Sequence, residues 1–479
     1  MTTSSPERDV RSPRSSSTPG WFVTEAERQR GALTTLLGDL VHAPSLSTDE
    51  GDVVAQLEHA MEELGYDEVR VDPLGSVIGR IGDGPIRVVY DSHVDTVAVG
   101  SRAEWAHDPF EPTILPDAGG GVLHGRGASD DKAGIAAMVH GGALYRRLAF
   151  DPRITLYVVG SVQEEACDGL ALEHVLTAEL PRPDLVVLGE ATRCQVFRGN
   201  RGRIEALIRV SGSSCHASAP ERGRNPVYAL APVVEEVQAL DGRLGVGPFL
   251  GRGSIALTKI ECETPGLNSV PATATLYLDR RLTEGESPEA ALEALRSLPS
   301  VQAAGATVEL LQYEATSYTG TPVAQDKRFA TWVTPADHPG VLAGLETGEQ
   351  ALGQHLELGH WVFSTNGVAS MGKLGIPTIG FGPGDEVHAH SAHDQCPLDD
   401  LVTAAAWYAA FPGVFADVLA RGDGSRDSPE VVRGAGREPD VAAGGSGGVG
   451  SVGPASGDGG AGSVGPASGN GGPGRSGRR

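Results

Sequence analysis

The stretch that decides the fold reads VVYDSHVDTVAVG from Val88 to Gly100 and HGRGASDDKAG from His124 to Gly134. A short apolar run leads directly into His93 and Asp95, and Asp130 follows where an apolar-periodic helix begins. Open α/β folds place their ligands where strands end and helices begin. We therefore expect this stretch to supply an imidazole and several carboxylates to a functional site at one edge of a sheet.

The same arrangement occurs twice more along the chain. The apolar run at 154–159 leads into Glu164 and Glu165, and the run at 185–188 leads into Glu190. Both runs have the length and composition of buried strands. One such acidic loop would be read as a solvated turn. Three in a row, each after an apolar strand, predict that the acidic side chains meet in space.

The composition excludes several classes of protein. The 479 residues carry a formal net charge of −24, which argues against a nucleic-acid partner. There is no run of eighteen apolar residues, so no membrane span is expected. The five cysteines (167, 194, 215, 262 and 396) lie far apart and form no Cys-x-x-Cys pair. A disulfide framework is therefore not expected, and a reducing, cytoplasmic location is the simplest inference.

The chain divides by composition into tails and a folded part. Residues 1–20 and 423–479 are rich in Ser, Pro or Gly and poor in apolar side chains, so both are predicted to be disordered tails. Between 199 and 313 the pattern changes to alternating strands and amphipathic helices in a βαββα order, without acidic loops. We interpret this segment as an inserted domain. The main domain would then comprise 21–198 and 314–422.

The periodicity of apolar residues predicts the secondary structure. Helices are expected at 24–40, 49–64, 135–144, 225–240, 288–298 and 398–411. Strands are expected at 69–71, 77–81, 86–90, 154–159, 185–188, 203–210, 254–260, 273–279, 361–363 and 377–381.

The acidic loops carry residues suited to metal binding. His, Asp and Glu are ligands for zinc, manganese or cobalt. Carboxylate-rich sites suit two ions ~3.5–4 Å apart that share a bridging carboxylate and a water. A further carboxylate must then take the proton of that water. Of Glu164 and Glu165, one could bind metal and the other could act as the base. Asp130 and Asp131 could instead simply cap a helix.

The motif order resembles the di-zinc metallopeptidase family that includes acetylornithine deacetylase, succinyl-diaminopimelate desuccinylase, carboxypeptidase G and aminoacylase. The resemblance covers the folded part and rests on His93-x-Asp95, Gly-Arg-Gly-x-x-Asp130-x-Lys132-x-Gly134, Glu164-Glu165, Gly189-Glu190 and a late His. LDRRLT and HAHSAHDQCPLDDL are most similar to a branch linked to selenium metabolism. The resemblance implies an α/β fold, with a mixed-sheet, di-metal aminopeptidase-like catalytic domain. It also implies an inserted α+β lid (βαββαβ, ferredoxin-like) that mediates dimerisation.

The resemblance implies a ligand set for two divalent metal ions, Zn²⁺ with Co²⁺ or Mn²⁺ as alternatives. The implied ligands are His93, Asp130, Glu165, Glu190 and His390. Asp130 would bridge the ions and be followed by a cis peptide bond.

The late histidine is chosen by spacing, because the family pattern has an acidic residue and Leu eleven positions after the ligand. Asp400-Leu401 then selects His390. His393-Asp394-Gln395 departs from the Asn/Asp-Glu of the family, so His388 and His393 stay open as alternatives.

The resemblance also implies catalytic roles. Asp95 would orient His93, and Glu164 would be the general base. His216, in the motif HxSxPExGxNP, would stabilise the oxyanion, often in the active site of the partner subunit. Read without the family, His216 would be a turn residue beside Ser and Pro.

Two further positions match family contacts to a substrate carboxylate. They are Asn268 and Arg281, with Arg280 as an alternative to Arg281. An arginine fork suits a carboxylate.

The expected function is a metal-dependent hydrolase of C–N amide bonds, which deacylates an N-acyl amino acid or similar small amide through a metal-activated water. A dipeptidase or carboxypeptidase on the same scaffold is the nearest alternative, and a non-catalytic binding protein with the same fold is a more distant one. The expected partners are a small amide or peptide substrate with a carboxylate and a second copy of the chain, bound through the inserted domain. Neither nucleic acid nor a membrane is expected as a partner.

Overall fold

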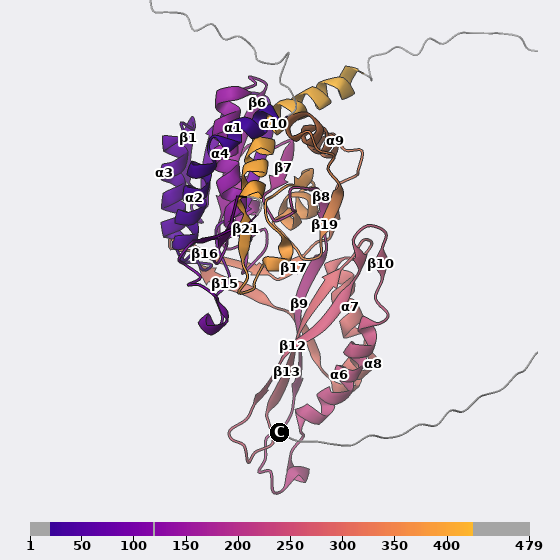
Figure 1. Cartoon of the computed structure of the whole chain (residues 1–479). Coiled ribbons are helices and arrows are strands. Elements are labelled where there is room, and N and C mark those ends of the chain that lie inside the picture. The colour runs from indigo at the N-terminus through magenta and orange to yellow at the C-terminus, as the bar shows by residue number, and fades with distance from the viewer. Residues whose placement is uncertain (1–19, 118–119, 425–479) are drawn as a thin grey trace, which may run out of the picture. The chain divides into compact units, whose positions relative to one another are not determined.

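The computed structural model describes residues 20–117 and 120–424 (Figure 1). The predicted tails, 1–20 and 423–479, lie almost entirely outside these residues. The described part contains a large mixed sheet and a separate small antiparallel sheet, which confirms the predicted α/β fold class.

The large sheet has a parallel centre and antiparallel flanks. Strands β6, β3, β7 and β20 run parallel, and β1, β2, β8 and β18 continue the sheet in antiparallel pairs. The order across the sheet is β1 (Glu68–Val71), β2 (Val77–Ile81), β6 (Ile154–Ser161), β3 (Ile86–His93), β7 (Leu185–Leu188), β20 (Thr378–Gly380), β8 (Val196–Asn200) and β18 (Trp332–Val333), with β19 (Leu358–Trp361) also on β8.

Helices α4 and α10 pack against each other and against the large sheet. Tyr90 on β3 donates a hydrogen bond to the carbonyl of Tyr408 on α10, at 2.9 Å. The predicted helix at 24–40 is two helices, since the N–H of Gln29 bonds the carbonyl of Ala26 in a tight turn. The helices of this part are α1 (Trp21–Glu27), α2 (Arg30–His42), α3 (Gly51–Glu63), α4 (Lys132–Leu148), α5 (Leu170–His174), α9 (Pro339–Thr347) and α10 (Leu398–Gly424).

Helix α10 is long and apolar enough to cross a membrane by length and composition alone. Within its most apolar window, 78% of the residues are buried inside the fold. Burial against neighbouring elements accounts for this composition, because a core helix is apolar on most of its sides.

The small sheet is antiparallel and has the ferredoxin-like strand order (Figure 1). Its strands, in spatial order, are β12 (Ser254–Glu263), β13 (Thr273–Leu282), β9 (Gly202–Ser211) and β14 (Thr307–Leu310). Helices α6 (Pro226–Asp241), α7 (Pro288–Arg296) and α8 (Pro299–Ala304) supply the rest of the βαββαβ pattern. Short strand β17 (Arg328–Phe329), on the returning chain, also pairs with β9.

Three smaller units complete the fold. The elements are the three-stranded sheet β21 (Gln395–Pro397), β5 (Val122–His124) and β4 (Thr113–Leu115), the hairpin β15 (Gln312–Thr316) with β16 (Pro322–Asp326), and the hairpin β10 (Val246–Gly247) with β11 (Gly251–Arg252).

The apolar side chains form two separate cores. One lies between the large sheet and its helices, and the other consists only of residues between Ile204 and Val308. The domain boundaries at 198/199 and 313/314 remain predictions. The five cysteines are free thiols.

Candidate metal centre

The centre of the large sheet brings the acidic loops together. Strand β3 lies between β6 and β7, with His93 paired to Ser161 and Asp91 paired to Leu188. Because the three strands are parallel and in register, their carboxyl ends meet at one edge. Glu164 and Glu190 each follow their strand within three residues and therefore reach the same edge.

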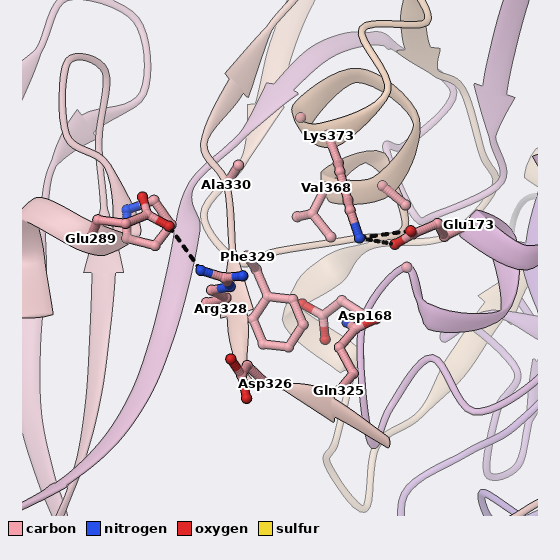
Figure 2. Close-up of a pocket in the computed structure, with 14 residues that line it drawn as sticks. Asp168, Glu173, Glu289, Gln325, Asp326, Arg328, Phe329, Ala330, Val368 and Lys373 are labelled. Atoms are coloured by element: carbon pink, nitrogen blue, oxygen red, sulfur yellow. Dashed lines mark hydrogen bonds and ion pairs between the residues drawn. The ribbon is translucent and has the colours of Figure 1, made fainter. Parts of the chain in front are cut away.

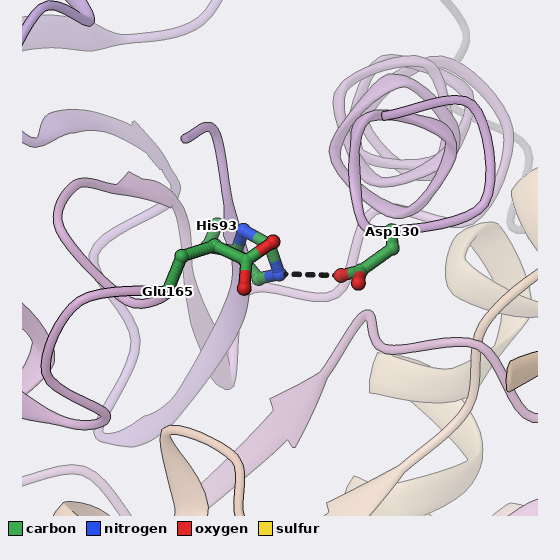
Figure 3. Close-up of side chains that lie close together, drawn as sticks. All are labelled: His93, Asp130 and Glu165. Carbon is green, nitrogen blue, oxygen red and sulfur yellow. Dashed lines mark hydrogen bonds and ion pairs between the residues drawn. The ribbon is translucent and has the colours of Figure 1, made fainter. Parts of the chain in front are cut away.

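The Asp130 carboxylate lies between two imidazoles. Its Oδ1 is 2.9 Å from Nε2 of His93, a contact drawn as a dashed line in Figure 3, and its Oδ2 is 3.3 Å from Nε2 of His390. Nε2 of His93 is also 3.7 Å from Glu190, and Nε2 of His390 is 2.8 Å from Glu165. Each oxygen of Asp130 thus belongs to a different His–Glu pair.

These donor atoms fit divalent metal ions. Two groups, His93–Asp130–Glu165 and His93–Glu164–Glu190, each have their ligand atoms within 4.8 Å of one another. The donors are imidazole nitrogens and carboxylate oxygens without any thiolate, the set preferred by Zn²⁺, Co²⁺ or Mn²⁺ in catalytic sites.

The cluster is short of positive charge. Over 20–117 and 120–424, the ion pairs of Asp130, Glu165 and Glu190 are made only with histidines. Burial, with nearby Asp131, raises the pKa of Glu190 well above its ordinary value. Burial and nearby Asp168 do the same to the pKa of Glu164. Carboxylates that resist ionisation when crowded together are stabilised in their charged form by cations.

Asp95 contacts His93 chiefly through its backbone. The Nδ1 of His93 lies 2.9 Å from the carbonyl oxygen of Asp95 and 3.7 Å from its carboxylate. The carboxylate instead accepts hydrogen bonds from the backbone N–H groups of Glu164 and Glu165, at 3.0 and 3.1 Å. Asp95 therefore orients the imidazole and also anchors the loop with both glutamates.

Asp394 anchors the loop that carries Asp130. Its buried carboxylate accepts hydrogen bonds from the N–H groups of Gly127 (2.7 Å) and Ser129 (2.8 Å) and pairs with Arg126 at 3.0 Å. The expected cis peptide bond is present between Asp130 and Asp131. This role of Asp394 was not predicted from the sequence, where the only signal was the departure of residues 393–395 from the family pattern.

Of the three late histidines, the structure brings only His390 to the carboxylates, within the described residues. The Nε2 of His388 lies 3.3 Å from the side-chain nitrogen of Gln395. His393 is exposed, and its backbone N–H bonds Ser391.

His216 and Asn268 lie together on the small-sheet part of the chain. The N–H of Ala217 bonds the carbonyl of Asn268 at 2.8 Å, and His216 forms an isolated bridge with Ser269. Both side chains are exposed. Among the described residues, neither makes a hydrogen bond or ion pair with the carboxylate cluster.

Arg281 lies at the other end of the same sheet. Thr273 of β13 pairs with Ser211, whereas Arg281 pairs with Arg203, so the two ends of β13 are about 27 Å apart at the usual rise per residue. The guanidinium of Arg281 forks onto Asp279 at 2.7 and 3.0 Å. The alternative, Arg280, is buried and bonds Glu286.

A separate cavity of about 350 Å³ is lined by Asp168, Phe329 and Arg328, among others (Figure 2). Its lining includes none of the predicted ligands. Its cations are paired, Lys373 with Glu173 and Arg328 with Glu289. It therefore adds no donor to the centre.

Comparison with known proteins identifies the family. A profile described as peptidase family M20/M25/M40 matches residues 89–412. YgeY of Escherichia coli strain K12, an uncharacterized protein, is 42% identical over 391 residues, which cover 82% of this chain and 96% of YgeY. Succinyl-diaminopimelate desuccinylase of Cereibacter sphaeroides strain KD131 is 30% identical over 263 residues, which cover 53% of this chain and 68% of that enzyme.

A solved structure gives the same fold. The YXEP protein of Bacillus subtilis, described as a dinuclear metal binding peptidase of family M20, aligns with a TM-score of 0.59 and 16% identity over 82% of this chain and 99% of YXEP. The matches and the donor set define a metallohydrolase, and the chain belongs to peptidase family M20/M25/M40.

Removal of metal should destabilise the protein. Because the carboxylates have too few cationic partners, treatment with a strong chelator is expected to lower the Tm by about 5–10 °C, and added Zn²⁺ or Co²⁺ should restore it. Differential scanning calorimetry measures this. In the Asp130→Asn variant, the chelator should lower the Tm far less than in the wild-type protein. If the chelator left the wild-type Tm unchanged, the assignment of these residues to a metal centre would be contradicted.

Proposed function

We propose that this chain is a di-metal amidohydrolase that deacylates an N-acyl amino acid or a similar small amide. The observation that carries the proposal is the Asp130 carboxylate, whose two oxygens face His93 and His390 beside Glu164. A relative at 30% identity is named a desuccinylase, which favours deacylation. The similarity to a selenium-linked branch adds no substrate to the proposal.

The proposed ligands form two sets that share Asp130. His93 and Glu190 would hold one ion, and Glu165 and His390 the other. Two such ions supply Lewis acidity, which lowers the pKa of a water and polarises an amide carbonyl. Zn²⁺ is the proposed metal, with Co²⁺ or Mn²⁺ as alternatives.

Glu164 is the proposed general base. Its carboxylate is buried and lies within 4.8 Å of the donor atoms of His93 and Glu190. It takes a proton from the water whose oxygen bonds to the carbonyl carbon. It later delivers that proton to the leaving nitrogen as the C–N bond breaks.

His216 is the proposed oxyanion donor. Its Nδ1 accepts a hydrogen bond from the backbone N–H of Ser218 (3.1 Å) and lies 2.8 Å from the Ser218 hydroxyl oxygen. A neutral ring that accepts at Nδ1 carries its proton on Nε2. The exposed Nε2–H can therefore donate to charge that develops in the transition state.

The substrate and the assembly complete the proposal. Arg281 and Asn268 would contact a substrate carboxylate, and the chain would form a homodimer through the inserted domain, with the two residues coming from different subunits. Arg281 lies near one end of β13, and Asn268 lies in the loop that precedes the other end, which supports such a division. The protein would act in the cytoplasm, with neither nucleic acid nor a membrane as a partner.

Replacement of the base should separate metal binding from turnover. Glu164→Gln is expected to lower kcat at least ~100-fold, because an amide cannot serve as the proposed base, while the metal content stays at the wild-type value. Steady-state kinetics and elemental analysis measure the two effects. The exposed Glu62→Gln serves as a control, and a Glu164→Gln variant with near-normal kcat would remove Glu164 from the mechanism.

A substrate panel separates the candidate activities. N-acetyl and N-succinyl amino acids should be hydrolysed with a higher kcat/KM than dipeptides, in a chelator-sensitive way. Higher values for dipeptides would favour the peptidase alternative. Failure to hydrolyse any amide in the presence of bound metal would favour a non-catalytic binding protein.

Mixing of two inactive variants tests the shared active site. If His216 acts in the partner subunit, Glu164→Gln and His216→Ala proteins should together recover about a quarter of wild-type activity, because half of the randomly exchanged dimers have one intact site. Native mass spectrometry should verify the exchange. Proven exchange without recovered activity would assign His216 to its own subunit.

A further inference from the structure

Two loops with unusual backbones meet behind the metal centre. Thr48 has a φ of 76° and Gln163 a φ of 58°, both in the left-handed region that residues other than glycine seldom adopt. Gln163 directly precedes Glu164 and Glu165. The backbone at 163 therefore sets the direction in which both glutamates leave the sheet.

One buried carboxylate bonds both of these residues. The Oε1 of Glu50 accepts the N–H of Thr48 at 2.9 Å and the N–H of Gln163 at 3.1 Å. Glu50 is fully buried and lies at the N-cap of α3, a helix packed against β1 and β2. Its oxygen is therefore held at a defined position between the loops.

The neighbouring N–H groups are held in the same way. The N–H groups of Glu164 and Glu165 donate hydrogen bonds to the carboxylate of Asp95, which also accepts a hydrogen bond from the hydroxyl of Ser47 at 2.6 Å. Three consecutive N–H groups, 163 to 165, thus donate to two buried carboxylates from other segments. The side chain of Gln163 is held as well, since its Oε1 accepts the hydroxyl of Tyr313 at 3.0 Å.

We propose that Glu50 is a positioning residue for this enzyme, whose Oε1 fixes the left-handed turn at Gln163 and thereby aims Glu165 at the metal and Glu164 at the substrate. The inference rests on the proposed roles of these two glutamates. Glu50 lies outside the motifs of the family resemblance, and it makes no hydrogen bond to a proposed ligand side chain within the described residues. It acts through the backbone of the loop.

Substitutions can distinguish a positioning role of Glu50 from a role in core packing. If the acceptor oxygen matters, Glu50→Gln should behave as wild type, because its amide oxygen can accept both N–H groups, whereas Glu50→Met should not. If the left-handed turn is what Glu50 stabilises, Gln163→Gly should compensate in part, since glycine adopts positive φ without strain. Lost core packing would not be repaired by a glycine at 163.

The test uses the full chain, stripped of metal and titrated with Zn²⁺ against a chromophoric chelator. Glu50→Met should weaken the affinity of one of the two sites by about 10–100-fold and alter the visible spectrum of the Co²⁺ form. Glu50→Gln should stay within about threefold of wild type, and Glu50→Met with Gln163→Gly should regain at least about threefold. Should Glu50→Met not fold, Glu50→Asp, which withdraws the oxygen by one methylene, takes its place with the same expectation.

The metal titration can overturn the positioning role of Glu50 in three ways. Wild-type affinity in Glu50→Met, an equal loss in Glu50→Gln, or no recovery with Gln163→Gly would each overturn it. Where an amide substrate is found, kcat should fall with the metal affinity while KM changes little. The metal titration needs no substrate, so the pattern can hold even if no amide is hydrolysed, which would count against the proposed function alone.

Discussion

The structure depends on the crowding of like charges at one sheet edge. Asp130, Glu164, Glu165 and Glu190 converge there, and the ion pairs of Asp130, Glu165 and Glu190 within the described residues are made by histidine alone. Such a cluster is unfavourable in a buried place unless cations and hydrogen-bond donors offset the repulsion. The parallel register of β6, β3 and β7 brings the loops with His93, Glu164 and Glu190 to this edge, and Asp130 joins them from the loop before α4, so contacts from other segments must hold the loops in place.

That outside support comes from a second set of carboxylates. Glu50, Asp95 and Asp394 are buried, and each accepts backbone N–H groups from a loop that carries a proposed ligand. The supports come from the start of α3, the end of β3 and the loop before β21. Segments far apart in the sequence therefore determine the geometry of one small volume.

The sequence predicted the parts of the fold that leave a local pattern. The buried strands, the acidic loops after them and the βαββα pattern of 199–313 follow from apolar periodicity and motif order, whereas the sixth element of the βαββαβ order was implied only by the family resemblance. Strand β3 extends to His93, beyond the predicted end at Tyr90, because pairing with β6 continues there. The supports at Glu50 and Asp394 left no such pattern, since an acid at the start of a helix or in a loop is common and its partner is set only by tertiary packing. The positions of His216 and Arg281 at opposite ends of one sheet likewise follow from strand register, which spacing alone does not give.

The pairing of β17 with β9 has a mechanical consequence. Three segments meet where the chain passes between the two cores. Strand β17 pairs with β9, with Arg328 opposite Ile204 and Phe329 opposite Arg203, and the backbone of Leu311 bonds both Glu205 and Lys327. The crossing is thus a hydrogen-bonded ribbon of three segments, which can twist along its length. Any motion between the two cores would bend or twist this ribbon as one piece, and it would carry the exposed His216 together with the small sheet.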